Sequence, residues 1–112
     1  MPVIYQLTSR PCSEANDPYE YEYQFFLSQD SAVIHLHKKM IKAIKTLKLK
    51  EADSILWREH ELKFCKLLLK NSSSDKKVWE AYLKMQSIFN EIIEDYSLHD
   101  IIFFLEKKPA IK

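Results

Sequence analysis

No glycine occurs in this chain of 112 residues, although average usage of about 7% would supply roughly eight. Phosphate-binding loops of the Walker type and dinucleotide-binding fingerprints both need glycine where the backbone approaches a phosphate, because a Cβ atom would block the approach. Nucleotide chemistry that depends on such loops is therefore excluded. The primed turns of β-hairpins also lose their most favoured residue, which together with abundant lysine, leucine, isoleucine and glutamate favours helices.

Cysteine, net charge and long apolar runs are also scarce. The two cysteines, Cys12 and Cys65, form no CxxC or Cys/His spacing, which favours a reducing compartment. The net charge of +1 provides no overall field that would attract nucleic acid or an acidic membrane. No segment has the apolar length of a transmembrane helix, and the first residues lack the pattern of a secretory signal. We therefore expect a cytoplasmic protein with no membrane contact, although a protein exported through a non-classical signal would show the same sequence features.

Residues 52–70 are predicted to form a central helix with two apolar flanks. One flank carries Ile55, Leu62 and Leu69, and the other carries Trp57, Phe64 and Leu68. This apolar surface exceeds what one neighbouring helix would cover. The helix is therefore expected to be covered on two sides, by other helices of the chain or partly by another protein. A second copy is one candidate, because symmetric dimers are the commonest oligomers.

Further helices are predicted before and after this central segment. Residues 30–50 and 76–96 each carry an apolar stripe at helical spacing, and Ser74 is well placed to cap the second of these helices. A short fourth helix is expected over residues 99–107. The apolar run at residues 101–105 also fits a buried strand, but a strand there would need a distant partner, so we favour the helix.

The N-terminal region is rich in aromatic residues. Residues 3–7 are β-branched and aromatic and indicate a short strand, whereas residues 8–17 are rich in loop formers. Residues 19–25 alternate between aromatic and polar side chains, as in a strand, although Asp17 and Pro18 also make a good helix start. We favour the strand, which would pair with residues 3–7.

These patterns predict one mostly α domain spanning residues 1–112. Residues 1–29 form an extended aromatic segment, with a short β-hairpin as one option. Residues 30–108 form a small helical bundle of three long helices and one short C-terminal helix.

No catalytic constellation is evident in the sequence. The polar run REHE at residues 58–61 differs from the HExxH zinc motif, which needs two histidines one helical turn apart. A hydrolase built on Cys65 and His60 is disfavoured, because a cysteine among leucines is usually a small core residue. We expect no enzyme activity, no metal and no cofactor.

Several residues are candidates for contact with another protein. Trp79 and Leu83 lie off the core stripe of residues 76–96, and exposed tryptophan and tyrosine are enriched at binding hot spots. Glu61 lies inside the apolar arc of the central helix, where a carboxylate needs an internal partner or a polar contact in an interface. The candidate partner-binding residues are Trp79, Leu83, Tyr19, Tyr21, Tyr23, Trp57 and Glu61. We expect a small regulator that binds another protein, such as an inhibitor, an immunity-type protein or an adaptor or chaperone.

Nucleic-acid binding is the alternative function. Lys38, Lys42 and Lys45 form a basic face on the helix over residues 30–50, and tyrosines would provide stacking surfaces. The acidic residues among the aromatic residues at 19–25 and the neutral overall charge argue against it. A lysine face on a helix is usually only a solvated face.

Overall fold

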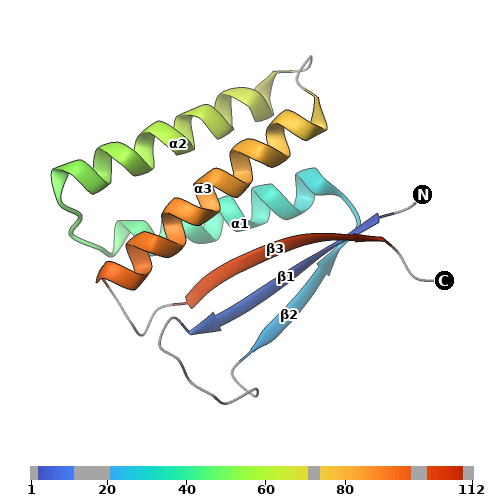
Figure 1. Ribbon diagram of the computed structural model, residues 1–112, viewed down its shortest axis with the longest axis horizontal. Coiled ribbons are helices and arrows are strands. Elements are labelled where there is room, and N and C mark those ends of the chain that lie inside the picture. The colour runs from blue at the N-terminus through green and yellow to red at the C-terminus, as the bar shows by residue number, and fades with distance from the viewer. Residues whose placement is uncertain (1–2, 12–20, 71–73, 97–100, 110–112) are drawn as a thin grey trace.

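The part of the chain that the structure describes folds into three helices and a three-stranded antiparallel sheet (Figure 1). The computed structural model describes residues 3–11, 21–70, 74–96 and 101–109. In chain order the elements are β1 (Val3–Pro11), β2 (Glu22–Phe26), α1 (Gln29–Lys45), α2 (Glu51–Leu69), α3 (Asp75–Tyr96) and β3 (Ile101–Pro109). The predicted mostly α bundle with a short C-terminal helix is therefore wrong, and the fold is of the α+β class.

The two N-terminal segments pair as antiparallel strands, as the alternation over residues 19–25 predicts. Tyr5 on β1 lies opposite Phe26 on β2. β1 also includes residues 8–11, which were expected to be irregular, because these residues find strand partners elsewhere in the chain. Loop-forming residues in this segment do not prevent strand formation once such partners are present.

The segment predicted as the C-terminal helix contains the strand β3 instead. β3 pairs antiparallel with β1, and Leu105 lies opposite Leu7. The sheet order is β2-β1-β3, so the distant partner of this apolar run is the first strand of the chain. The sheet therefore combines two strands of the predicted N-terminal segment, residues 1–29, with one strand from the predicted bundle, residues 30–108.

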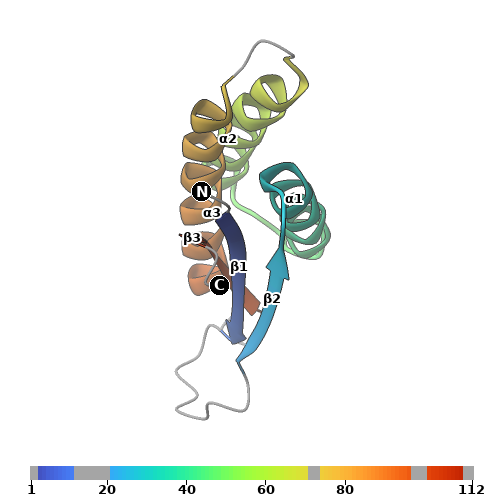
Figure 2. The ribbon, with the colours of Figure 1, turned by 90° about the vertical axis from the view of Figure 1, so that its right-hand side faces the viewer.

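All three helices lie on one side of the sheet (Figure 1, Figure 2). α1 packs against β1 and β2, α3 packs against β3, and α2 packs against α3. Tyr5 and Leu7, whose side chains point toward the helices, are buried. The ring of Phe103 on β3 stacks on that of Phe89 on α3, with 5.6 Å between their centroids. The core therefore lies between the sheet and the α1 and α3 helices.

Amide side chains on α3 bond to the outer edge of β3. Asn90 donates through Nδ2 to the Phe103 carbonyl at 2.9 Å and accepts the Phe103 N–H through Oδ1 at 3.2 Å. One turn earlier, Gln86 Oε1 accepts the Leu105 N–H at 3.0 Å. These bonds satisfy backbone groups that an edge strand would otherwise leave open to another chain.

α2 is the helix farthest from the sheet (Figure 1). Its Trp57 and Phe64 are buried in the core. Its opposite face carries Ile55, Leu62 and Leu69, all of which are exposed. Of the two apolar flanks predicted for this helix, the described residues cover only one.

Polar contacts connect the start of α2 with the helix that follows it. No side chain caps α2; instead the Lys50 N–H donates to the Tyr96 hydroxyl at 2.9 Å. That hydroxyl donates to Asp53 Oδ2 at 2.6 Å, so the end of α3 binds the start of α2. The predicted cap of α3 is confirmed, because Ser74 Oγ accepts the Lys77 N–H at 3.3 Å.

α1 ends at Lys45, earlier than the predicted residue 50. Residues 46–50 form the connection to α2. Within the described ranges, none of the helices combines the length and the apolar character needed to cross a membrane.

Candidate functional site

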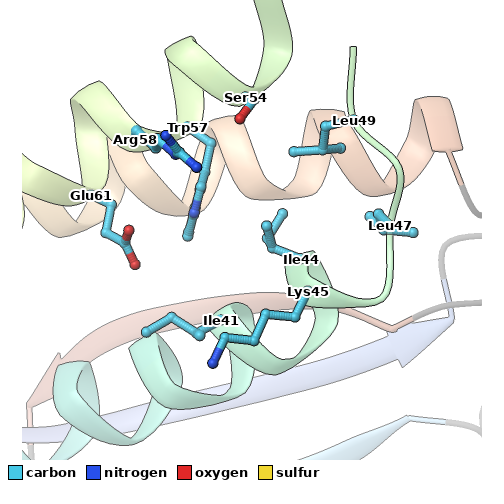
Figure 3. Close-up of a pocket in the computed structure, with 9 residues that line it drawn as sticks. All are labelled: Ile41, Ile44, Lys45, Leu47, Leu49, Ser54, Trp57, Arg58 and Glu61. Atoms are coloured by element: carbon cyan, nitrogen blue, oxygen red, sulfur yellow. The ribbon is translucent and has the colours of Figure 1, made fainter. Parts of the chain in front are cut away.

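A pocket of about 360 Å³ lies between α1 and α2 (Figure 3). Trp57 and Glu61 point toward it from α2, and Ile41 and Ile44 line it from α1. Trp57 is only 4% exposed, so its side chain belongs to the core. A residue buried in this way offers almost no surface to a partner, which removes Trp57 from the candidate binding surface.

The carboxylate of Glu61 has an internal partner. Its Oε2 lies 2.8 Å from Nε2 of His37 on α1, and both side chains are mostly buried. The same imidazole packs against the ring of Phe64, with 5.4 Å between centroids. Glu61 therefore joins α1 to α2, as expected for a carboxylate inside an apolar arc.

A cysteine lies next to this pair, but the geometry does not support nucleophilic catalysis. Cys65 Sγ is 3.9 Å from His37 Nε2, the same nitrogen that contacts Glu61. A catalytic triad needs the nucleophile and the carboxylate on different ring nitrogens, so that one orients the ring while the other gives up its proton. Burial raises the pKa of the Cys65 thiol, and Glu61 raises it further, so the thiol stays protonated and weakly nucleophilic at neutral pH.

His60, considered together with Cys65 from the sequence, is held by its own helix. His60 Nδ1 lies 2.9 Å from the Leu56 carbonyl on its own helix, so its ring bonds within α2. Within residues 3–11, 21–70, 74–96 and 101–109, no group of three His, Cys, Asp or Glu side chains is arranged to hold a metal ion.

Trp79 and Leu83 are half-buried and pack against the core. The Trp79 indole lies between Tyr5 of β1 and Tyr82 of its own helix, with centroid distances of 5.6 Å and 6.1 Å. The first strand therefore covers much of the surface that the helical wheel leaves open. What stays exposed of Trp79 and Leu83 is too limited to form the centre of a candidate surface.

The most exposed aromatic residues lie on β2 and just before it. Tyr23 is 57% exposed and Phe25 is 59% exposed, and Tyr21 is also exposed. Tyr23 lies opposite Thr8 and Phe25 opposite Gln6. Because opposite residues of an antiparallel pair share a face, Tyr23 and Phe25 lie on the side of the sheet away from the helices. We call Tyr21, Tyr23 and Phe25 the β2 aromatic face.

The lysine face predicted on α1 is exposed at Lys38, Lys42 and Lys45. Lys42 lines a shallow hollow together with Glu22 of β2, so a carboxylate lies beside this part of the basic face. That carboxylate lowers the local positive potential which a phosphate backbone would need. The structure thus provides a basic strip but no stacking aromatic residue within it.

No protein-family model, curated protein or solved structure matches the chain. The candidate site therefore rests on this chain's own geometry. Two residues considered from the sequence, Cys12 and Tyr19, lie outside the described residues. Phe25 was not predicted as a binding residue from the sequence. It continues the alternation of Tyr21 and Tyr23, and this pattern would have placed it on the same exposed face.

His35 on α1 is expected to make stability dependent on pH. Burial lowers its pKa, and Lys39 and Lys38 lower it further. Its Nε2 is buried, with no hydrogen-bond partner among the described residues, and its ring lies 5.2 Å from that of Phe26. A histidine with a lowered folded-state pKa binds its proton more readily when unfolded, so its contribution to stability is present above about pH 6.5 and lost as the pH falls below it.

Replacing His35 by phenylalanine should therefore reduce the loss of stability on acidification, because the ring against Phe26 is kept and the titration is removed. Urea unfolding of the parent and of His35→Phe at neutral and mildly acidic pH measures the difference. An equal fall in the free energy of unfolding for both proteins would show that His35 does not carry this pH dependence.

Proposed function

We propose that the chain is a non-enzymatic protein-binding module whose β2 aromatic face and adjoining strand edge take up an extended segment of another protein. The observation that carries this proposal is an edge strand with large aromatic side chains exposed at alternate positions. An extended peptide added to such an edge gains backbone hydrogen bonds, while its alternate side chains contact the aromatic residues.

The two edges of the sheet differ in a way that supports this assignment. β3 is closed by Asn90 and Gln86 of α3. Among the residues that the structure describes, no comparable side chain bonds to the outer edge of β2. Natural edge strands are usually protected by charged side chains, proline or a covering element; among the five residues of β2 only Glu22 is charged, and Tyr23 and Phe25 are exposed beside it. An open aromatic edge is characteristic of a surface that binds a partner.

The partner is another protein rather than a small molecule, a membrane or a nucleic acid. Glu22 is exposed on the same strand, so a basic residue in the bound segment would complement it. A chain of this kind acts by covering part of its partner, as an inhibitor, an immunity-type protein or an adaptor or chaperone does. The proposal includes a cytoplasmic location, in line with the cysteine pattern.

Removing the aromatic rings tests the proposal without removing the strand. In the double variant Tyr23→Thr and Phe25→Thr, threonine keeps a high strand propensity, and both sites are exposed, so stability should change by less than about 1 kcal/mol. Purification of tagged protein from its native host should recover a partner with the parent and lose it with this variant. Ile101→Thr is the matched control, because it removes an exposed apolar side chain from the other edge strand.

The alternative function is tested in the same experiment. Charge reversal at Lys38, Lys42 and Lys45 should leave partner recovery intact if these residues are only solvated. Recovery of nucleic acid that is lost on charge reversal, and that weakens with salt, would favour the nucleic-acid alternative. Partner recovery that survives loss of both aromatic rings would contradict the assignment of the β2 aromatic face.

A further inference from the structure

The outer face of α2 carries an apolar stripe that the fold leaves uncovered. Ile55 is 58% exposed, Leu62 is 55% exposed and Leu69 is 81% exposed. On a helical wheel these residues lie opposite Trp57 and Phe64, which face the core. Ordinary surface helices bury their apolar residues on one face only, so a second apolar face needs its own explanation.

The spacing of the stripe has a known structural use. The three residues follow one another at intervals of seven, which is close to two helical turns, so they line up along nearly the whole of α2. In a helix-helix seam two positions of each seven face the partner; this repeat supplies one of them, and Arg58 and Cys65 hold the other. The stripe therefore fits a straight helix better than a loop or a strand.

The charges beside the stripe indicate which helix could pack against it. Glu59 and Lys66 lie on the same flank of the stripe, one in each half of α2. If a second α2 packed antiparallel with Leu62 on the two-fold axis, Ile55 would face Leu69 of the second copy. Glu59 would then lie beside Lys66 of the second copy, and symmetry would repeat the pair. In a parallel two-fold arrangement the flank that carries Glu59 and Lys66 would instead face the opposite flank of the second copy, so Glu59 and Lys66 would not meet.

We infer that this chain forms a two-fold symmetric homodimer through antiparallel packing of α2 against α2 of a second copy. The antiparallel arrangement also sets the positive end of each helix dipole beside the negative end of the other. Such a contact is isologous, because the same surface serves both copies. α2 and β2 lie at opposite sides of the molecule, so the dimer leaves the β2 aromatic face free (Figure 1). The inference is independent of the proposed function.

The first test replaces the residue on the two-fold axis. Sedimentation velocity over a range of concentrations should show the parent as a monomer-dimer equilibrium. Leu62→Lys should raise the dissociation constant by more than about a hundredfold, because two ammonium groups would meet in an apolar seam. Leu27→Lys is the matched control, since Leu27 is a highly exposed leucine in the connection between β2 and α1, and it should dimerise like the parent.

The second test determines whether the two α2 helices pack antiparallel. Glu59→Lys alone or Lys66→Glu alone should weaken the dimer roughly tenfold, because two favourable pairs become repulsive. The double variant should regain the parent affinity. These residues are seven apart and do not contact each other within one helix, so the rescue reports the contact between copies.

Three results would overturn the inference. They are a parent that stays monomeric at every concentration, a Leu62→Lys variant that dimerises as well as the parent, and a double charge variant no better than either single one. Loss of the dimer in the Tyr23→Thr and Phe25→Thr variant would assign the contact to β2 and would equally overturn it. Circular dichroism should show that Leu62→Lys keeps the helix content and melting temperature of the monomeric parent.

Discussion

Replacing Trp57 by alanine is expected to lower the free energy of unfolding by about 3–5 kcal/mol, because it removes a large buried side chain and leaves a cavity. The indole is 4% exposed and packs against the ring of Phe89, with 6.1 Å between centroids. Urea unfolding followed by circular dichroism measures the change. If Trp57 instead served mainly to contact a partner, the same substitution would leave stability nearly unchanged and weaken binding.

Ile55→Ala is the matched control for this prediction. Ile55 lies two positions earlier on α2 and is exposed, so its truncation should change stability by no more than about 0.5 kcal/mol. Measurements at low protein concentration keep association through α2 from contributing. A loss of stability as large as that of Trp57→Ala would mean that the two apolar faces of α2 have been assigned the wrong way round.

The second large effect is expected at the edge of β3. Asn90→Leu preserves the approximate size of the side chain but removes both hydrogen bonds to the backbone of Phe103. Each of the two buried backbone groups left without a partner costs about 1–3 kcal/mol, so a total of about 2–6 kcal/mol should be lost. Hydrogen exchange should show the Phe103 amide exchanging faster than in the parent.

Glu91→Leu is the control for the edge. It places the same side chain at the neighbouring, exposed position of α3 and should leave both stability and exchange close to the parent values. Equal protection of the Phe103 amide in Asn90→Leu and in the parent would contradict the role assigned to Asn90.

The sequence was sufficient to predict the three long helices, because each carries an apolar stripe whose period is independent of the rest of the fold. The alternation over residues 19–25 likewise indicated β2. Residues 101–105 were assigned wrongly, because a continuous apolar run has no period that separates a helix from a buried strand. Only the tertiary position of β1 decides between them.

The exposure and pairing of side chains also depend on contacts between residues that are far apart in the sequence. Trp79 lies off the stripe of α3 and was predicted to be exposed, but α3 is also covered by Tyr5 of β1. The pairing of Glu61 with His37 depends on how α1 and α2 lie relative to each other, which no local pattern contains. Gln86 and Asn90, two amides one turn apart on a buried face, were the overlooked sign that a strand edge lies beside α3.

The strand order β2-β1-β3 has a consequence for how the protein is made. β1 is the central strand, yet one of its two neighbours, β3, is synthesised only after α1, α2 and α3. Until then, one side of β1 lacks its strand and the amides of α3 lack the backbone groups they bind. A growing chain can complete the β1-β2 pair and its helices early, but the sheet closes only after β3 emerges. During that interval β1 has an unpaired edge to which another nascent chain could add a strand, which makes this the stage of synthesis most prone to aggregation.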